Sequence, residues 1–170
     1  MLTSAFGSSR GTKLSESGGF RPFAGNTIIA PLLDSSIFPD LVMLQERLLS
    51  DGRDAYLVPL PQKSFHMTLF EGLCDECRGK DVWSSYVPLD APIDKATAIL
   101  KDRSALLPAL CGVVMRFDSL RINGAVSVGL MPTSCEHLER LRRYRMVASG
   151  VLGIPLPAVD TYINLITLPE

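Results

Sequence analysis

Histidine is scarce in this chain of 170 residues, which has only two, His66 and His137. The sequence also lacks a strong charge of either sign, because its formal net charge is -1. A chain without a basic excess does not bind nucleic acid through bulk electrostatic attraction, although a local basic site is still compatible with this balance. With 46 % hydrophobic and 21 % charged residues, the composition is that of a globular protein that can build a core.

Long hydrophobic runs are absent as well. The longest nearly apolar stretch, residues 105–115, is far too short to span a bilayer and contains a proline. Residues 1–13 are small and polar, so they lack the basic and then apolar pattern of a signal peptide. We therefore expect a soluble cytoplasmic protein with no membrane partner.

Cysteine is present four times, but its spacing gives no strong site. A chain of this length does not need a disulfide scaffold. Cys74 and Cys77 have the C-x-x-C spacing of a redox pair or of half a zinc site, yet only Cys135 and His137 are available as a second half. No βαβ pattern surrounds the motif. We interpret it as a turn after a strand that carries two thiols, and we expect no metal and no cofactor.

The first half of the chain predicts a strand, a helix and two further strands. Residues 1–19 are rich in Ser and Gly and are predicted to be a disordered N-terminal segment, whereas residues 20–170 are predicted to form one domain. A strand is expected over 26–33, and two more over 55–60 and 64–70. A helix is expected between the first two strands, with Ser35 or Ser36 as its cap, Pro39 in its first turn and Gly52 as its stop. Its apolar residues at helical spacing are Phe38, Leu41, Leu44 and Leu48.

The second half predicts the order helix, strand, strand, helix, strand. Asp90 and Pro92 are expected to begin the first helix, and the strands are expected over 111–117 and 125–131, separated by the turn signal at 123–124. A capping box over 133–136 should begin the last helix, which Gly150 should end, and 162–168 should be the last strand. Helices between strands that are distant in sequence indicate an α+β protein of two lobes.

Several cationic side chains could bind a phosphate, but a position on the protein surface without such a role is the favoured interpretation for each. The arginines of the last helix are expected on a solvated face, where cations also suit the helix C-terminus. His137 has acidic neighbours and is expected at the surface. Arg78 is a possible phosphate contact, although a surface arginine is the default. The helix arginines are Arg140, Arg142, Arg143 and Arg145.

The segment around His66 carries the most information. His66 and Thr68 lie two residues apart in a stretch that alternates like a strand, so both project from one face. An imidazole beside a hydroxyl on a rigid strand can hold a phosphate and move a proton. The alternative is a half-buried strand histidine without function, next to a threonine that is simply a good strand former. The residues expected to enter the core on the other face are Phe65, Met67 and Leu69.

This segment resembles the H-x-T-hydrophobic motif of the 2H phosphoesterase superfamily, the RNA ligase-like cyclic phosphodiesterases. The longer strings at 20–27 and 64–72 are similar to a little-characterised branch of it. The resemblance runs from about 18–168 and implies an α+β fold with antiparallel sheets and flanking helices in two lobes around a central cleft. Family members carry two H-x-T motifs, one from each lobe, facing each other across that cleft.

The second motif of the resemblance should fall within residues 162–168. Thr167 and Leu168 are retained there, but Leu165 stands where the histidine belongs. Strand alternation places Leu165 and Thr167 on one face. The chain ends at Glu170, earlier than we expect for this branch, in which another strand usually completes the lobe.

The resemblance implies chemistry at a phosphodiester, often a 2′,3′-cyclic phosphate on RNA or on a related small molecule, without a metal. His66 would be catalytic, as a general acid or base. Thr68 and Thr167 would bind the substrate through its non-bridging phosphate oxygens, where negative charge develops. The implied partner is a small phosphorylated ligand or an RNA end, and we expect a monomer.

Leucine cannot transfer a proton, and the loss of one of two acid–base groups costs about 10²–10⁴ in rate. The leading hypothesis is a 2H phosphoesterase-like protein that hydrolyses or binds a cyclic phosphate or nucleotide phosphodiester, with activity impaired by the missing histidine. The alternative is a non-catalytic phosphate- or nucleotide-binding or regulatory protein on the same scaffold. A third interpretation is an aberrant C-terminal end. The sequence leaves the natural substrate and catalytic competence open.

Overall fold

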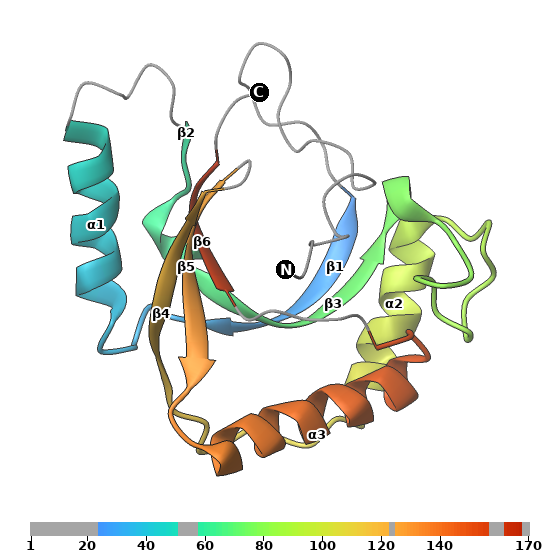
Figure 1. The fold of residues 1–170 in the computed structure, drawn as a ribbon. Helices are drawn as coiled ribbons and strands as arrows, with labels where there is room; N and C mark the ends of the chain where they lie inside the picture. The colour runs from blue at the N-terminus through green and yellow to red at the C-terminus, as the bar shows by residue number, and fades with distance from the viewer. Residues whose placement is uncertain (1–23, 51–57, 123–124, 157–161, 168–170) are drawn as a thin grey trace, which may run out of the picture.

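The computed structural model describes residues 24–50, 58–122 and 125–156, together with the backbone of 162–167 (Figure 1). Short 3-10 turns at Gln62–Ser64 and Asp75–Cys77 flank the strand that carries His66. In chain order the helices and strands are β1 (Gly25–Pro31), α1 (Phe38–Ser50), β2 (Val58–Pro59), β3 (His66–Cys74), α2 (Ile93–Ser104), β4 (Met115–Ile122), β5 (Ala125–Pro132), α3 (Cys135–Leu152) and β6 (Tyr162–Thr167).

The strands form one six-stranded sheet in the order β1-β3-β6-β5-β4, with β2 paired to β6. Every pairing in this sheet is antiparallel. The predicted α+β class, with antiparallel strands and flanking helices, is therefore confirmed. The two halves of the chain meet within this sheet, because β6 lies between the β1–β3 pair and the β4–β5 hairpin.

The helices pack on one side of the sheet, outside its curve (Figure 1). Beneath α1 and α3, Leu41 and Leu141 belong to a core cluster with Phe65 and Val128 from the sheet side. A second cluster joins α2 and α3 to the later part of β3. Burial raises the pKa of the Tyr144 phenol above its usual value of 10.0, so this α3 ring stays neutral in the first cluster. Within the described residues, both core clusters thus join the sheet to the helices.

Two irregularities in the β1–β3 ladder adjust which side chains of β3 enter the core. Ile28 pairs with Phe70 and Ile29 with Thr68, so Leu69 is an extra residue that faces no partner on β1. Leu69 and Phe70 are consequently both buried, although they are consecutive. At the second irregularity, the Asn26 side-chain oxygen accepts a hydrogen bond from the Leu73 backbone N–H at 2.8 Å. Both bulges lie after His66 and Thr68 along β3.

The ends of α3 differ from the sequence prediction. Ser134 is the N-cap, and its hydroxyl accepts a hydrogen bond from the His137 backbone N–H at 3.2 Å. The predicted capping box from Thr133 to Glu136 is wrong, because the Thr133 hydroxyl instead donates to the Val114 carbonyl. The helix continues past the predicted stop at Gly150 and ends at Gly153, whose φ of 65° favours glycine.

Three other predicted boundaries also need correction. The N-cap of α2 is Pro92 rather than Asp90, without a side-chain cap. The strand expected over 111–117 begins at Met115 and continues to Ile122, because Gly112 adopts a left-handed φ of 67° that interrupts an extended chain. The cap predicted at Ser35 or Ser36 also needs correction, because α1 begins only at Phe38 and the Ser35 hydroxyl donates to the Leu32 carbonyl instead. The predictions for 1–19, Gly52, 55–57 and 123–124 lie outside the described residues.

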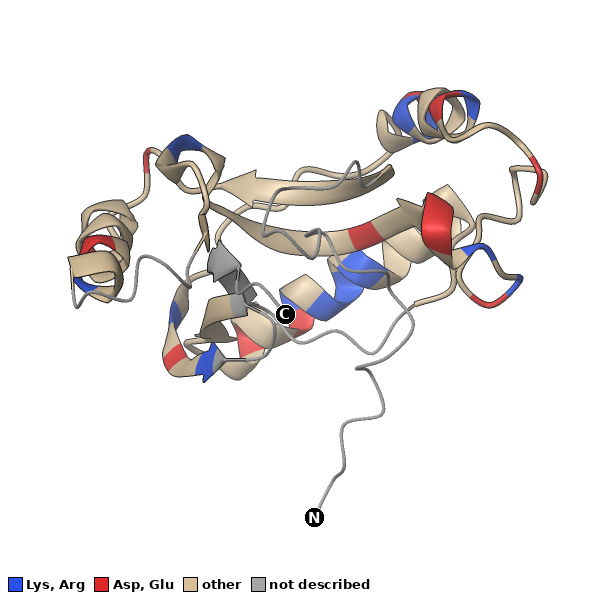
Figure 2. Ribbon diagram, turned by 90° about the horizontal axis from the view of Figure 1, so that it is seen from above, with Lys and Arg blue, Asp and Glu red and all other residues tan. Residues whose placement is uncertain are grey.

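Among the described residues, Lys and Arg are interspersed with Asp and Glu rather than gathered in one basic surface (Figure 2). This distribution agrees with the small net charge of the sequence. Of the helices in the described part of the chain, none combines the length and the apolar character that crossing a membrane requires.

Candidate active site

The alternation predicted around His66 is confirmed in β3. Phe65, Met67 and Leu69 point towards the helices and are only 1 %, 8 % and 7 % exposed. His66 and Thr68 are half-buried and alternate with these core residues. The imidazole and the hydroxyl therefore lie on the face of the sheet turned away from the helices.

The neighbouring strand β1 extends this face. Pro31 pairs with His66, Ile29 with Thr68 and Thr27 with Glu71, and directly paired residues of antiparallel strands share a face. The three β1 residues are exposed, and Ile29 is 44 % exposed. We call the face that carries these three β1 residues and His66, Thr68 and Glu71 the open face.

A hydrogen bond to the backbone fixes the tautomer of His66. Its Nδ1 atom lies 2.6 Å from the Ser64 carbonyl oxygen. A carbonyl oxygen can only accept, so Nδ1 carries the proton in this bond and Nε2 of the neutral ring has its lone pair available. The Ser64 carbonyl is positioned by the 3-10 turn, in which the Ser64 backbone N–H and hydroxyl both donate to Pro61, at 2.8 and 2.6 Å. In the neutral ring, this is the tautomer that a general base acting through Nε2 requires.

The strand β6, on which the second motif was expected, is the direct neighbour of β3. Met67 pairs with Ile163. Thr167 pairs with Val58 on β2 and with Ala125 on β5. It therefore lies farther along β6, where the neighbouring strand on that side is β2 instead of β3. The side chains of Leu165 and Thr167 lie outside the described residues. The structure therefore brings the two motif strands side by side, and the role of Thr167 stays a prediction.

The β4–β5 hairpin adds polar positions to the open face that the sequence reasoning missed. Asn164 of β6 pairs with Ser127 of β5, and Ser127 pairs with Arg121 of β4. In the next row Gly129 pairs with Tyr162 and with Ser119. A single glycine within a strand is a signal of close approach by a neighbouring group, and this signal was available at Gly129.

The C-x-x-C segment and Arg78 are arranged as a structural turn. Cys74 ends β3 and Cys77 ends the following 3-10 turn. The Arg78 guanidinium lies 4.5 Å from the centre of the Trp83 ring, and its Nε donates to Asp75 at 2.9 Å. Among the described residues, no group of three or more His, Cys, Asp or Glu side chains could hold a metal ion. These contacts give Arg78 a structural role in its own loop.

One of the four arginines on α3 differs from the other three. Arg140, Arg142 and Arg143 are exposed, as expected for a solvated face. Arg145 is only 8 % exposed, and its Nε donates to the Leu69 carbonyl at 2.9 Å, at the bulge of β3. The prediction that Arg145 is solvated is wrong, because it lies on the same helix stripe as the buried Leu141 and Ala148. Arg145 supports β3 from the helix side.

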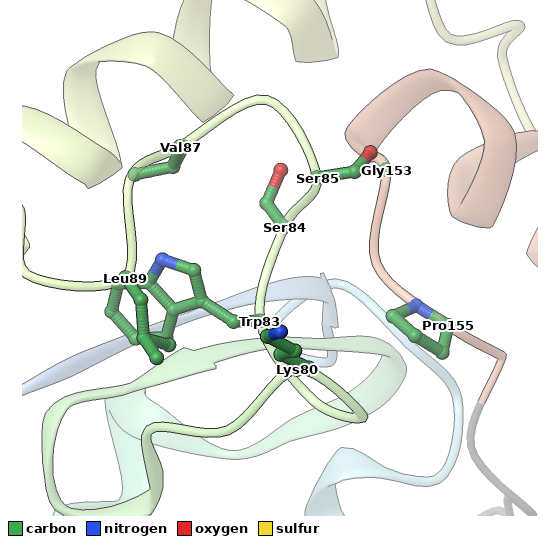
Figure 3. A pocket seen from close by; sticks show the side chains of 8 residues that line it. All are labelled: Lys80, Trp83, Ser84, Ser85, Val87, Leu89, Gly153 and Pro155. Atoms are coloured by element: carbon green, nitrogen blue, oxygen red, sulfur yellow. The ribbon is translucent and has the colours of Figure 1, made fainter.

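A pocket of about 300 Å³ lies away from His66, beside the loop that follows β3 (Figure 3). Trp83 and Val87 form apolar parts of its wall, and Lys80 lines it as well. The Ser84 hydroxyl is occupied in donating to the Leu152 carbonyl at 2.6 Å. The other lining residues are Ser85, Leu89, Gly153 and Pro155. None of these side chains is an imidazole, a carboxylate or a thiol, so Lys80 is the titratable group among these lining residues.

Comparison with known proteins gives a family and a structural relative. A family model named 2H-phosphodiest, described as a domain of unknown function (DUF1868), matches residues 13–126. The matched residues include His66 and Thr68 and end before β6. The crystal structure of the conserved protein of unknown function ATU0111 from Agrobacterium tumefaciens is similar, with 27 % identity and a TM-score of 0.81 over 94 % of this chain and 69 % of that chain. A search of curated proteins finds no match.

Proposed function

The chain belongs to the 2H phosphoesterase family, and from this premise we propose that it binds and hydrolyses a cyclic phosphate or nucleotide phosphodiester on the open face, with His66 as the proton-transferring residue. The observation that carries the proposal is the Nδ1–H bond of His66 to the Ser64 carbonyl. It leaves Nε2 able to accept a proton next to the Thr68 hydroxyl, on a strand supported by the core.

In this proposal, Nε2 of His66 takes a proton from a water molecule as its oxygen attacks the phosphorus. The Thr68 hydroxyl donates a hydrogen bond to a non-bridging phosphate oxygen, where charge increases in the transition state. Thr167 stays the residue that the family pattern predicts for a second such bond, although it lies farther along β6, beside Val58 and Ala125. The bond from phosphorus to one ring oxygen of the cyclic phosphate breaks, and the leaving oxygen takes its proton from a second water molecule. The hydroxide formed then takes the proton held by His66, which restores the neutral ring. The products are a phosphomonoester and a free hydroxyl.

The reaction proceeds slowly in this proposal, because Leu165 replaces the second proton-transferring histidine of the family pattern. A group that protonates the leaving oxygen contributes about 10²–10⁴ in rate. We therefore expect Leu165→His to raise the turnover of a cyclic phosphate. The same substitution in a His66→Ala background should give no increase. An unchanged rate for Leu165→His in a folded protein would remove position 165 from the proposal.

The direct test is hydrolysis of a panel of nucleoside 2′,3′-cyclic phosphates by the purified protein and two variants. His66→Ala should reduce turnover by about 10²-fold or more, because it removes the general base. His137→Ala is the matched control, since it removes the other histidine, which lies on α3 rather than on β3. Thermal unfolding of both variants checks that each is folded.

The outcomes separate the enzyme from the binding protein of the same scaffold. Loss of turnover in His66→Ala, with normal turnover in His137→Ala, supports the enzyme. An absence of turnover in the wild type, together with binding of a cyclic phosphate that weakens in His66→Ala, would replace hydrolysis by binding alone. Turnover that is equal in all three proteins would refute a role of His66.

A further inference from the structure

The strand register aligns His66 with Arg121 across the sheet. Because Met67 pairs with Ile163, the same antiparallel register places position 164 opposite His66. Position 164 pairs with Ser127, and Ser127 pairs with Arg121. Residues paired in this way share a face, so Arg121 belongs to the open face and to the row of His66. The adjacent row joins Thr68 through position 162 to Gly129.

Gly129 provides the space in which the Arg121 side chain lies. A Cβ atom at Gly129 would be 3.1 Å from Nε of Arg121 and 2.5 Å from the Ser119 hydroxyl oxygen. Arg121 Nε donates to that hydroxyl at 3.3 Å, and the nearest Asp118 carboxylate oxygen lies 3.9 Å from Nη2. The guanidinium therefore lies over β5, on the side towards β3, and 38 % of the Arg121 side chain is exposed.

The separation of the two groups determines what they can bind together. Gly129 on β5 is two strands from β3, which corresponds to about 10 Å along the sheet. A single phosphate held by His66 and Thr68 does not extend over that distance. A ligand with a second anionic group does, and one nucleotide carries phosphates at its two ends with a comparable span. Guanidinium is well suited to a phosphate, because its planar donors bind two oxygens at once.

Resting on the proposed function, we propose that Arg121 binds a second phosphate of the substrate, one nucleotide away from the cyclic phosphate at His66. The favoured substrate class is then a nucleotide with a 2′,3′-cyclic phosphate and a 5′-phosphate, as at an RNA end, rather than a nucleoside with the cyclic phosphate alone. Glycine at position 129 makes this contact possible, because a Cβ atom there would lie 3.1 Å from Nε of the arginine.

The test compares adenosine 2′,3′-cyclic phosphate with the same compound bearing a 5′-phosphate. The wild type should show a higher kcat/KM for the 5′-phosphorylated compound. Arg121→Gln should lower this ratio by about tenfold or more, because one charge-assisted contact is lost. Arg121→Lys, which keeps the charge without the paired donors, should give an intermediate ratio. Dissociation constants for both compounds give the same ratio if turnover is too slow to measure.

Arg116→Gln is the matched control. Arg116 lies on the same strand as Arg121 and pairs with Met131, five residues away along β4 and outside the row of His66. Arg116→Gln changes the charge by the same amount as Arg121→Gln, so a general electrostatic effect would lower the ratio in both variants. Loss of a specific contact would lower the ratio in Arg121→Gln alone. Thermal unfolding of all variants checks that they are folded.

The result that would overturn the inference is a wild-type protein without preference for the 5′-phosphate, or a preference that survives in Arg121→Gln. Either result leaves the proposed function intact if His66→Ala still abolishes turnover or weakens binding. If neither compound binds to the wild type, the proposed function fails, and the inference fails with it.

Discussion

The open face of the sheet and the pocket beside Trp83 differ in a way that bears on how a site is recognised. The open face carries a histidine with a fixed tautomer, a threonine on the same strand and an arginine in the same row. The Trp83 pocket has a volume of about 300 Å³, but its lining lacks an imidazole, a carboxylate and a thiol. The difference shows that a hollow and a chemically equipped surface need not coincide.

The two regions also differ in what holds them in place. Trp83 is 4 % exposed and belongs to the core cluster between α2, α3 and the later part of β3. His66 and Thr68 lie above the core, with Phe65 and Met67 buried beneath them. Substitutions in the pocket should therefore change the free energy of unfolding, whereas substitutions on the open face should change the turnover of a cyclic phosphate.

The largest effect on stability should come from Trp83→Ala. Truncation of this ring should lower the free energy of unfolding by about 3–5 kcal/mol, because it leaves a cavity and removes the surface on which Arg78 stacks. Urea unfolding measures the change. The turnover of a cyclic phosphate, divided by the folded fraction, should stay near the wild-type value. If Trp83→Ala does not fold, Trp83→Phe serves instead, and a specific loss of turnover in it would contradict the separation.

Thr68→Val should have the opposite profile. It removes a hydroxyl while nearly preserving shape, so kcat/KM for a cyclic phosphate should fall by about tenfold to a hundredfold through a lost hydrogen bond to a charged group. The free energy of unfolding should change by no more than about 0.5 kcal/mol, as for most surface changes. Thr27→Val on β1, which is exposed on the same face, is the matched control. Equal losses in both variants would show that Thr68 has no specific contact with substrate.

The smallest effect should come from Lys80→Ala at the pocket. Lys80 is the cationic side chain of the pocket lining, and the pocket is separated from His66 by the length of β3. Both kcat and KM for a cyclic phosphate should stay within about twofold of the wild type, because surface charges at this separation are largely screened. A large rise in KM would indicate that the anionic ligand binds in the pocket instead of on the open face.

The features predicted successfully from the sequence are those with a local signal. The alternation around His66 predicted that Phe65, Met67 and Leu69 enter the core, because strand geometry sends alternate residues to opposite faces. It did not predict the burial of Phe70, which follows the bulge at Leu69. The position of Arg145 was also readable in principle, since it follows the buried Leu141 by four residues. In that case, the prediction gave more weight to the charge than to the helical spacing.

The features that escaped prediction depend on contacts between distant segments. The row from His66 to Arg121 follows from the register of four strands, which no single segment encodes. The Ser134 cap replaced the predicted capping box because Thr133 bonds to Val114, a partner 19 residues away. The tautomer of His66 depends on the turn that presents the Ser64 carbonyl. Such details require the folded backbone.

The most direct test of the role of His66 is ¹⁵N NMR of the two imidazole rings during titration with a nucleoside 2′,3′-cyclic phosphate. We predict that neutral His66 carries its proton on Nδ1, and that its Nε2 resonance shifts on ligand addition while the His137 resonances do not. Saturation of a bound ligand without any change at His66, or a neutral His66 protonated on Nε2, would contradict a phosphate site on the open face.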